Sequence, residues 1–503
     1  MNKIAGKKQP ASSMVTFYHD IEQNIDCKAN PNECRQMVKE FLVLEKKYGV
    51  SATYNVVGKL FHKQPDLIQW ILQEGQEVAF HSYNHQSDWQ PKYYSDEINL
   101  CRKVSSLPCG YRSPRGQWDQ ITLKTLWKNG FLWNAENDSN KEPYFIHKGL
   151  VRLPIATDDW PLHTGALNVE EWVQQFSTLL KRKPYFGFGC HDCVASLAPE
   201  ERLKAWERVL QIATENKSLL VTFSEAADLF RRAALSRYYN IIAKNWNRGS
   251  KTLYRTKRFQ EIIRAETEKL NQPVIADLGS GGGVLSSLLK DRAKKIYCVD
   301  NAAGMVADVD SDSCITACLG EVTDSNLRDN SVDLVICARV IEYLFWPDRL
   351  ADEIKRIGKI GATYITTFPA LCGTPPSHEG SPPARIRHYF TPDEIQKWAN
   401  QIGSGCLIGI QYERSEPDNS ETELRYRAIE KNPPWGACPT NWVYIGTIQN
   451  KITPKHYRKT IPVWAFDFRF PSQRYDRLKI YLENVGKWLP MPIKRLVKCI
   501  VYR

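Results

Sequence analysis

The chain has 503 residues, of which 42% are hydrophobic and 25% charged, a composition that fits two or three folded domains and excludes a largely disordered protein. Its net charge is +12, but residues 451–503 hold 13 Lys or Arg against 3 Asp or Glu and supply +10 of that charge. The remainder of the chain is therefore nearly neutral, and we expect no nucleic acid as a partner.

The termini and the cysteines indicate the compartment. The first 13 residues are basic and polar and no apolar segment follows them, so we expect no signal peptide. No apolar run reaches the ~20 residues that span a bilayer. The 14 cysteines are scattered, and several lie in apolar stretches, which predicts free thiols rather than a disulfide framework. Together these features predict a cytoplasmic protein.

Apolar patterns with strand and helix spacing alternate from residue 14 to about residue 230. The alternation predicts parallel strands joined by helices. The clearest segments are a strand at 14–21, a helix at 31–50 that ends at Gly49, a strand at 51–58, a helix at 65–75 and a strand at 76–85 that runs into two histidines.

A second helical region opens at residues 237–247, and we therefore place a domain boundary near 232–236. A helix at 256–270 and a fresh strand–loop–helix unit follow it. Further short apolar strands are predicted at 294–300, 331–338, 361–369 and 441–449. This block predicts a second α/β domain.

The first domain contains groups suited to hydrolysing an amide with the help of a divalent metal. Such a metal acidifies water and polarises the carbonyl, and imidazole and carboxylate are its expected ligands. His81 and His85 are four residues apart, which would put both imidazoles on one helical face. Asp20 and Glu22 stand at the end of the first predicted strand.

An isolated pair of histidines at this spacing also occurs by chance, so the surrounding segments matter. Three further polar segments each follow an apolar stretch. They are YRSPRG at 111–116, TDDW at 157–160 and FGCHD at 188–192.

In order and spacing, these segments resemble the five motifs of the polysaccharide deacetylase family, which includes the nodulation-factor chitooligosaccharide deacetylases. The resemblance covers about residues 12–230, with HSYNH and YRSPRG fitting well and TDDW and GCH fitting loosely. It implies a distorted (β/α) barrel and a substrate that is an amino sugar or glycan. Zinc is the metal that we expect most.

The resemblance assigns roles to individual residues. It implies that His81 and His85 bind the metal and that His191 is the general acid that protonates the leaving amine. Arg112 would orient the catalytic base. Either Asp158 or Asp159 would orient His191 and keep it charged.

The first motif departs from the common family pattern, which has two adjacent aspartates. Here the order is His19, Asp20, Ile21 and Glu22. Relatives with a spacer between the two acids imply that Asp20 is the base and Glu22 the metal ligand, and the reverse assignment stays open. His19 is interpreted as structural.

A glycine-rich loop leaves a strand and enters a helix in the second domain. Asp277, Gly279 and Gly281 lie in this loop, Asp300 ends the next strand and Glu321 follows the third. This series resembles a class I S-adenosylmethionine-dependent methyltransferase over about residues 236–450. It implies that the loop surrounds the methionine moiety, that Asp300 binds the ribose and that Glu321 lies near the adenine.

A dinucleotide-binding unit is the alternative for this loop. Residues 279–284 read GSGGGV, with Val284 where the third glycine of that fingerprint belongs. His378 and His388 are candidate bases for the methyl acceptor, and plain loop positions are an equally good interpretation. No NPPY-type tetrapeptide follows the fourth strand, which disfavours methylation of a nucleobase amine.

The predicted fold class is therefore α/β, with a barrel, a Rossmann-like methyltransferase sheet and a basic extension. The predicted parts are a basic polar N-terminus at 1–13, a deacetylase-like domain at 14–232, a methyltransferase domain at 236–450 and a basic aromatic extension at 451–503.

Two questions stay open at this point. Residues 454–503 could lie on an anionic membrane surface or pack on the methyltransferase domain. The main functional hypothesis is a bifunctional enzyme that deacylates an amino sugar or glycan precursor and methylates a related acceptor. The alternatives are a hydrolase acting on a cyclic amide or ureide, and a chain in which one half only binds substrate.

Overall fold

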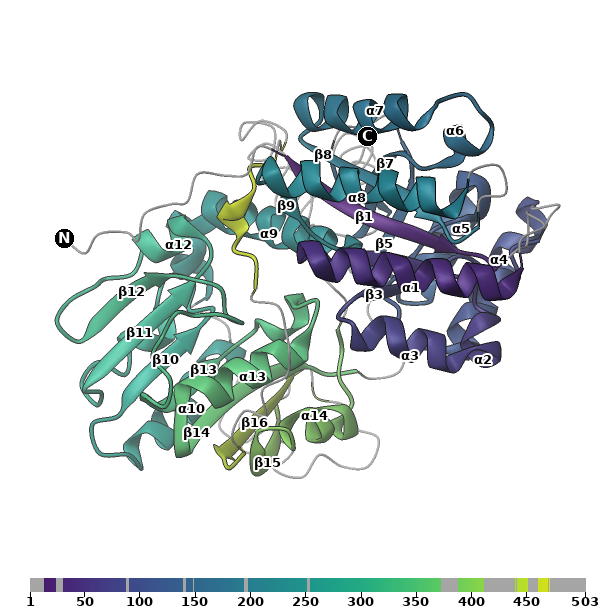
Figure 1. Ribbon diagram of the computed structural model, residues 1–503. Coiled ribbons are helices and arrows are strands. Elements are labelled where there is room, and N and C mark those ends of the chain that lie inside the picture. The colour runs from purple at the N-terminus through teal and green to yellow at the C-terminus, as the bar shows by residue number, and fades with distance from the viewer. Residues whose placement is uncertain are drawn as a thin grey trace, which may run out of the picture. The chain divides into compact units, whose positions relative to one another are not determined.

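The computed structural model describes residues 13–23, 30–86, 90–138, 142–147, 149–193, 198–250, 254–371, 388–410, 439, 441–450, 460–468 and 470. These residues form two compact units (Figure 1). The first unit ends at Ala233 and includes residues 463–468, and the second begins at Ala234. Each unit is described by itself.

Seven parallel strands of the first unit close into a ring, which confirms the predicted barrel. Their order is β1-β2-β3-β4-β5-β7-β8, and β1 pairs with both β2 and β8. The strands are β1 (Met14–Ile21), β2 (Ala52–Val56), β3 (Glu77–Phe80), β4 (Gly110–Tyr111), β5 (Trp133–Asn137), β7 (Leu150–Thr157) and β8 (Tyr185–His191). Outside the ring, β6 (Tyr144–His147) runs antiparallel to β7, and β9 (Leu219–Leu220) pairs with the start of β1.

Helices follow most of these strands, as the sequence predicts. The first of them, α1, begins after Asn30, whose side chain accepts a hydrogen bond from the amide of Asn32, and ends at Gly49 with φ 64°. The helices are α1 (Pro31–Tyr48), α2 (Leu60–Lys63), α3 (Pro65–Gln73), α4 (Pro91–Val104), η1 (Pro114–Gly116), α5 (Gln120–Lys128), α6 (Trp160–His163), α7 (Val169–Arg182) and α8 (Pro199–Glu215).

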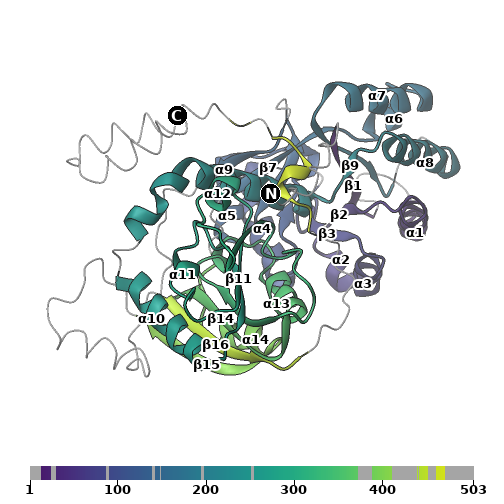
Figure 2. The same cartoon turned by 90° about the vertical axis from the view of Figure 1, so that its left-hand side faces the viewer.

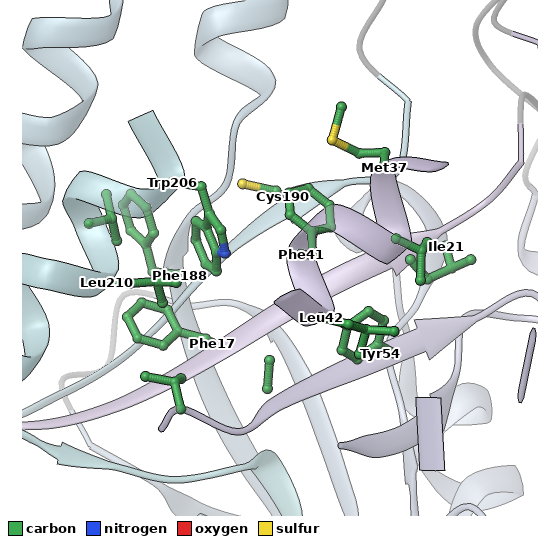
Figure 3. Packing of buried hydrophobic residues seen from close by; sticks show 14 of the residues in the cluster. Phe17, Ile21, Met37, Phe41, Leu42, Tyr54, Phe188, Cys190, Trp206 and Leu210 are labelled. Atoms are coloured by element: carbon green, nitrogen blue, oxygen red, sulfur yellow. The ribbon is translucent and has the colours of Figure 1, made fainter. Parts of the chain in front are cut away.

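An aromatic core joins the barrel wall to α1 and α8 (Figure 3). The ring of Phe17 on β1 lies 5.1 Å from Trp206 on α8, edge to face, and 5.9 Å from Phe176 on α7. Phe41 on α1 completes this layer, and all four side chains are buried. Such rings bury large apolar areas and fix the helices against the strands.

One helix, α9 (Phe223–Ser250), crosses the position where the sequence predicted a domain boundary. The change of unit falls within the predicted boundary region 232–236, and no helix end marks it, because neither Gly nor Pro occurs between 223 and 247 to stop the helix. The change from the first unit to the second at residues 233 and 234 therefore lies inside a continuous helix.

The start of α9 is hydrogen-bonded to the barrel strands. The amide of Phe223 donates to Thr53 Oγ1 at 2.9 Å, and the amide of Ser224 donates to the Glu77 carboxylate at 3.1 Å. Trp133 Nε1 donates to Ser224 Oγ at 2.8 Å. These bonds satisfy amides that have no partner within the helix.

The second unit is a seven-stranded sheet in the order β12-β11-β10-β13-β14-β16-β15, where only β16 runs antiparallel to its neighbours. This confirms the predicted Rossmann-like methyltransferase sheet. The strands are β10 (Val274–Leu278), β11 (Lys295–Asp300), β12 (Ile315–Leu319), β13 (Val332–Cys337), β14 (Gly358–Pro369), β15 (Gly403–Ile410) and β16 (Asn441–Ile448).

Helices cover both faces of this sheet (Figure 2). Phe259 and Ile263 of α10 pack on one face, and Leu350 of α13 and Trp398 of α14 pack on the other. The helical segments are α10 (Tyr254–Glu268), α11 (Val284–Ser287), α12 (Ala303–Ala307), η2 (Ile341–Tyr343), α13 (Pro347–Ile357), α14 (Pro392–Ala399) and, in the extension, η3 (Val463–Ala465).

The described part of the C-terminal extension divides between the two units. Thr460 Oγ1 lies 3.0 Å from Thr323 Oγ1 of the methyltransferase unit, in agreement with the prediction of packing there, whereas residues 463–468 belong to the first unit. Phe468 lies 5.3 Å from Phe230 and 4.8 Å from Phe466, and these residues belong to the first unit, not to the methyltransferase unit. Residues 454–459, 469 and 471–503, and the basic residues 1–12, lie outside the described residues. Within the described ranges, none of the helices combines the length and apolar character needed to span a bilayer.

The cysteines agree with the prediction of free thiols at nine described positions and contradict it at one. Cys193 is in a disulfide bond, and its partner is outside the described residues. Cys34, Asp192 and Cys193 lie close together, but a disulfide sulfur is not a thiolate and this group is no metal site.

Glu77 should matter for stability because its buried carboxylate joins β2 and β3 to the start of α9. It accepts hydrogen bonds from Thr53 Oγ1 at 2.7 Å and from the Ser224 amide. Glu77→Ala should leave buried donors without an acceptor and cost about 1–3 kcal/mol, seen as a lower urea midpoint. Glu74→Ala, which removes an exposed pair with Lys46, should change stability by less than about 0.5 kcal/mol. Equal effects would contradict this role.

Candidate active sites

Parallel register brings the polar residues of the first unit to one end of the barrel. Asp20 on β1 stands opposite Asn55 on β2 and opposite His191 on β8. His81 directly follows β3, Arg112 follows β4, and Asp158 and Asp159 follow β7. All the residues predicted for this site therefore gather at the carboxyl ends of the strands.

The segment His81–His85 is not helical, which corrects the prediction that helical spacing aligns the two imidazoles. Ser82 has φ 58° and His85 has φ 50°, so the backbone turns sharply after β3. Ser82 Oγ accepts a hydrogen bond from the His85 amide at 2.9 Å. This turn, rather than a helix, brings the two rings to a centroid distance of 5.1 Å.

Both imidazoles point at the same oxygen of Glu22. The Nε2 atoms of His81 and His85 each lie 3.2 Å from Glu22 Oε1, and all three side chains are buried. Burial raises the pKa of Glu22, but contacts with the two histidines outweigh it and hold that pKa well below its ordinary value. Glu22 is therefore an anion that needs positive charge beside it.

The tautomer of His81 makes this arrangement suited to a cation. Its Nδ1 lies 3.1 Å from the carbonyl oxygen of Arg112, which can only accept, so Nδ1 carries a proton. In the neutral ring, Nε2 then directs a lone pair toward the Glu22 carboxylate, another acceptor. A proton or a metal ion between the two acceptors relieves this conflict. Two nitrogens and one oxygen form a ligand set that suits Zn²⁺ and its neighbours.

Asp20 is held differently from Glu22. Asp20 Oδ2 accepts from Arg112 Nε at 2.8 Å, and Asp20 Oδ1 accepts from Asn55 Nδ2 at 2.8 Å. Burial raises the pKa of Asp20, but the charges of Arg112, His81 and His191 outweigh it and lower that pKa. The side chain is thus an oriented carboxylate that can accept a proton.

Arg112 stands among three carboxylates. Besides its bond to Asp20, its guanidinium lies 3.8 Å from Glu136 and 3.6 Å from Asp158. It also lies over the ring of Tyr18, 5.0 Å from the centroid. Since Arg112 is buried, these partners compensate the cost of removing its charge from water.

Of the two candidate aspartates, Asp159 is the one that contacts His191. His191 Nδ1 lies 2.6 Å from Asp159 Oδ1, and the His191 amide donates to the same carboxylate at 3.1 Å. Burial lowers the pKa of His191, but Asp159 outweighs it and raises that pKa well above its ordinary value. Asp158 instead faces Arg112 and accepts from the Trp160 amide at 2.9 Å.

The Nε2 of His191 faces the rest of the site. It lies 3.8 Å from Asp20 Oδ2 and 4.0 Å from Glu22 Oε1. A charged imidazole, an oriented carboxylate and a metal-type ligand set therefore surround one small volume. Hydrolysis of an amide requires one group that accepts a proton from water and another that donates a proton to the leaving amine, and this site contains both.

Sequence reasoning missed three residues of this site. Asn55 orients Asp20, Glu136 accepts from the Ser113 amide at 2.7 Å beside Arg112, and Asp192 accepts from the Glu22 amide at 3.1 Å. Burial raises the pKa of Asp192 to about 7. Asp192 follows His191 directly and could have been found as a strand-end acid. Asn55 and Glu136 could not, since nothing in their own segments distinguishes them.

His19 points away from the site, as its structural interpretation expects. Its Nε2 lies 2.6 Å from Glu45 Oε1, and its ring stacks on Phe41 at 4.1 Å. Because side chains alternate along a strand, His19 and Asp20 face opposite sides of β1.

The second site forms around the glycine-rich loop after β10. Gly279 has φ 76° and Gly281 has φ 54°, conformations that disfavour other residues. The Gly279 amide donates to the Val299 carbonyl at 2.7 Å, and the Gly281 amide donates to Asp300 Oδ2 at 3.0 Å. A Cβ at Gly279 would lie 2.2 Å from Val340 Cγ2, so the loop passes close to the segment after β13.

The three acids predicted for this site surround the loop at the ends of β10, β11 and β12. Asp277 accepts from Ser286 Oγ at 2.7 Å, and burial raises its pKa to about 6. Asp300 also accepts from the Ala302 amide at 2.9 Å, and burial, with help from Glu321, raises its pKa to about 6. Buried carboxyl groups with raised pKa values are stabilised by hydrogen-bond donors, and the hydroxyls of a ribose diol are such donors.

The far part of α9 lies beside the loop, which the sequence did not predict. Asn240 Oδ1 accepts from the Gly304 amide at 2.6 Å, and a Cβ at Gly281 would lie 3.2 Å from Trp246 Nε1. Ala243 packs with Ala302 and Met305. The candidate base His378 lies outside the described residues. His388 is described, and its ring lies 6.0 Å from Phe390.

Comparison with known families agrees with this division. The polysaccharide deacetylase family matches residues 14–132, and the methyltransferase domain family matches residues 276–366. The chain thus carries a polysaccharide deacetylase domain and a class I methyltransferase domain, both of them enzyme families, as the sequence predicts.

Individual relatives match only part of the chain. A peptidoglycan deacetylase of Helicobacter pylori is 25% identical over 145 residues, which are 27% of this chain and 47% of that protein. A chitooligosaccharide deacetylase of a Bradyrhizobium species is 34% identical over 101 residues, 18% of this chain and 46% of that protein. The chain therefore spans about half the length of these curated relatives.

Among solved structures, a family 4 carbohydrate esterase from Streptomyces lividans in complex with acetate is 17% identical. The match covers 41% of this chain and 90% of that chain, with a TM-score of 0.30.

The geometry predicts that Asp159, rather than Asp158, keeps His191 charged. Asp159→Asn should lower the pKa of His191, because the carboxylate that stabilises the imidazolium is lost. The pair stabilises the fold below the ordinary histidine pKa, and this contribution disappears as pH rises through the raised pKa. NMR titration of the ring protons, with a chelator present, would measure the change.

Asp158→Asn is the matched control and should lower the pKa of His191 less, since the Asp158 carboxylate accepts from the Trp160 amide and faces Arg112, whereas Asp159 bonds directly to the imidazole. A larger fall in Asp158→Asn than in Asp159→Asn would contradict the assignment.

Proposed function

We propose that the chain is a bifunctional enzyme that removes an N-acyl group from an amino sugar or glycan precursor and methylates a related acceptor. The observation that carries the first half is the cluster in which one Glu22 oxygen faces the Nε2 atoms of His81 and His85, with Asp20 and His191 beside it. The family matches of the two units support the combination.

Glu22, His81 and His85 would hold the divalent metal, and zinc is the ion that we propose. One atom of each lies within 4.8 Å of the others, whereas Asp20 is already engaged by Arg112 and Asn55. This difference favours Glu22 as ligand and Asp20 as base. When bound, the metal would polarise the acyl carbonyl and acidify water.

The chain's own residues would then move two protons. Asp20, oriented by Arg112, takes the proton of the attacking water. His191, charged by Asp159, donates a proton to the departing amine, which is a poor leaving group until protonated. The two groups lie 3.8 Å apart, so both can reach a single amide bound between them.

In the second unit, Asp277, Gly279 and Gly281 would surround the methionine part of S-adenosylmethionine, Asp300 would bind its ribose and Glu321 would lie near the adenine. The sulfonium supplies an activated methyl group. The protein's task is therefore mainly to position the acceptor in line with it.

For the substrate of the first half, we favour an acetylated amino sugar, because the matched relatives are named for chitooligosaccharide and peptidoglycan deacetylation. We further propose a cytoplasmic location, and a peripheral membrane contact through residues 454–503, because residues 451–503 supply +10 of the net charge and could bind anionic lipids.

Replacing Glu22 should affect metal binding, whereas replacing Asp20 should affect the rate of deacylation. Glu22→Gln and His81→Ala should lose most of the bound metal, because each removes one of three ligands. Asp20→Asn should keep the metal and lose about 10²–10⁴ in rate, as expected for a missing base. Elemental analysis and acetate release from acetylated chitooligosaccharides would measure both, and methylation should be spared.

His62→Ala, an exposed histidine on α2, is the matched control and should change neither quantity. If His81→Ala held as much metal as wild type, the site would be wrong. If Asp20→Asn deacylated at a near-normal rate, the assignment of the base would be wrong.

Asp300 should decide the affinity for S-adenosylmethionine. Asp300→Ala removes a charge-assisted hydrogen bond, a loss of roughly 1.5–3 kcal/mol, which is about 10- to 150-fold in affinity. Calorimetry of wild type, Asp300→Ala and the exposed control Asp310→Ala would measure it. Tight NAD binding by wild type instead would refute a methyltransferase.

A further inference from the structure

The loop from His81 to His85 carries both candidate imidazole ligands and has an unusual backbone. Ser82 has φ 58° and His85 has φ 50°, values that non-glycine residues rarely adopt. Such conformations persist only where the surrounding structure holds them. The hydrogen bond from the His85 amide to Ser82 Oγ lies within the loop, so other contacts must attach the loop to the barrel.

The carbonyl groups of the loop are held by the segment after β2. The Gly58 amide donates to the Ser82 carbonyl at 2.8 Å, and the Lys59 amide donates to the Tyr83 carbonyl at 3.0 Å. Lys59 Nζ donates to the Asn84 carbonyl at 3.3 Å. A Cβ at Gly58 would lie 2.8 Å from Tyr83 Cδ2, so glycine lets the two segments approach this closely.

The amide groups of the same loop converge on one side chain, the buried carboxylate of Glu97 on α4. Glu97 Oε2 accepts from the Tyr83 amide at 2.9 Å and from the Asn84 amide at 2.6 Å. Glu97 Oε1 accepts from Asn84 Nδ2 at 2.8 Å and from Gln86 Nε2 at 3.4 Å. Among the described residues, every hydrogen bond of the Glu97 carboxylate therefore goes to residues 83–86.

This carboxylate and the loop depend on each other. A buried carboxylate that lost its donors would cost free energy. Tyr83 and Asn84 lie in neither a helix nor a strand, so no regular series of backbone hydrogen bonds can replace Glu97 as the acceptor for their amides.

His85 should depend on Glu97 more than His81 does. His81 directly follows β3, its amide donates to the Val56 carbonyl at 2.9 Å, and its Nδ1 lies 3.1 Å from the Arg112 carbonyl oxygen. His81 is thus fixed by the strands themselves. His85 stands at the far end of the loop, after the two residues whose amides Glu97 holds.

We propose that Glu97 is a positioning residue that forms the metal site before the metal binds, by fixing the loop so that the His85 imidazole faces Glu22. The inference rests on the proposed metal site and deepens it by naming a residue that sets its affinity. Glu97 acts through the backbone of the loop, whereas the three ligand atoms belong to Glu22, His81 and His85. Groups that orient metal ligands typically contribute about 10- to 100-fold to metal affinity.

The test measures the zinc affinity of the full chain by competition with a chromophoric chelator. Glu97→Gln should weaken zinc binding about 10- to 100-fold, because its amide keeps one acceptor oxygen and turns an NH2 group toward the donors of the loop. Glu97→Asp keeps two acceptor oxygens and should retain part of the affinity. Asp96→Asn, at the exposed neighbour on the same helix, is the matched control and should leave the affinity unchanged.

Hydrogen exchange of the zinc-free protein separates a positioning role from a general structural one. In Glu97→Gln the peptide covering residues 82–86 should exchange faster, whereas the peptide covering β1, residues 14–21, should exchange as in wild type. Equal acceleration of both peptides, or unchanged exchange at residues 82–86, would overturn the positioning role.

Zinc binding by wild type is measured first. If wild type bound no zinc, the proposed metal site would fall and the role of Glu97 with it. If wild type bound zinc and Glu97→Gln bound it as tightly, the metal site would stand and the role of Glu97 alone would be overturned.

Discussion

The pairing of β1 with both β2 and β8 is the constraint on which the first site depends. It closes the barrel, and its parallel register sets Asp20 beside Asn55 on one side and beside His191 on the other. Because parallel strands end at the same rim, the ligands after β3, the arginine after β4 and the aspartates after β7 meet there too. A slip of one residue in β1 would exchange Asp20 for His19 and point the acid into the apolar core.

The same barrel also carries a series of buried charges. Asp20 pairs with Arg112, and Arg112 lies 3.8 Å from Glu136. Arg152 lies nearby, fully buried over the ring of Trp118 at 4.1 Å. Burial raises the pKa of Glu136 despite both arginines. Buried pairs add little to stability, so their value here is the fixed position of the Asp20 carboxylate.

Helix α9 takes part in both units. Its first residues are held by Thr53 and Glu77 of the barrel, and its later residues Asn240 and Trp246 lie beside the glycine-rich loop of the second sheet. A cut at 232–236 would therefore pass through a continuous helix and not through a linker. The second unit needs the later part of this helix to complete the surroundings of its loop.

Sequence patterns alone predicted the α/β class, many of the strands along the chain and most of the polar residues that the structure gathers at the two candidate sites. The end of a strand can be predicted where an alternating or unbroken series of apolar residues gives way to polar residues. Four site residues lie at such positions, namely His81, Arg112, His191 and Asp300. Family motifs then supplied roles that spacing could not.

Tertiary structure decided the rest. It chose Asp159 over Asp158 as the partner of His191, engaged Asp20 with Arg112 while leaving Glu22 to face two imidazoles, and added Asn55, Glu136 and Asp192. It replaced the expected helical turn at His81–His85 by a loop with two positive φ angles. It also brought Tyr239 and Tyr343 together across 104 residues of sequence. Local sequence patterns indicate which face of a helix or strand is buried. Which side chains contact one another depends instead on the distances between helices and strands. These distances are fixed only when the strands pair and the helices pack.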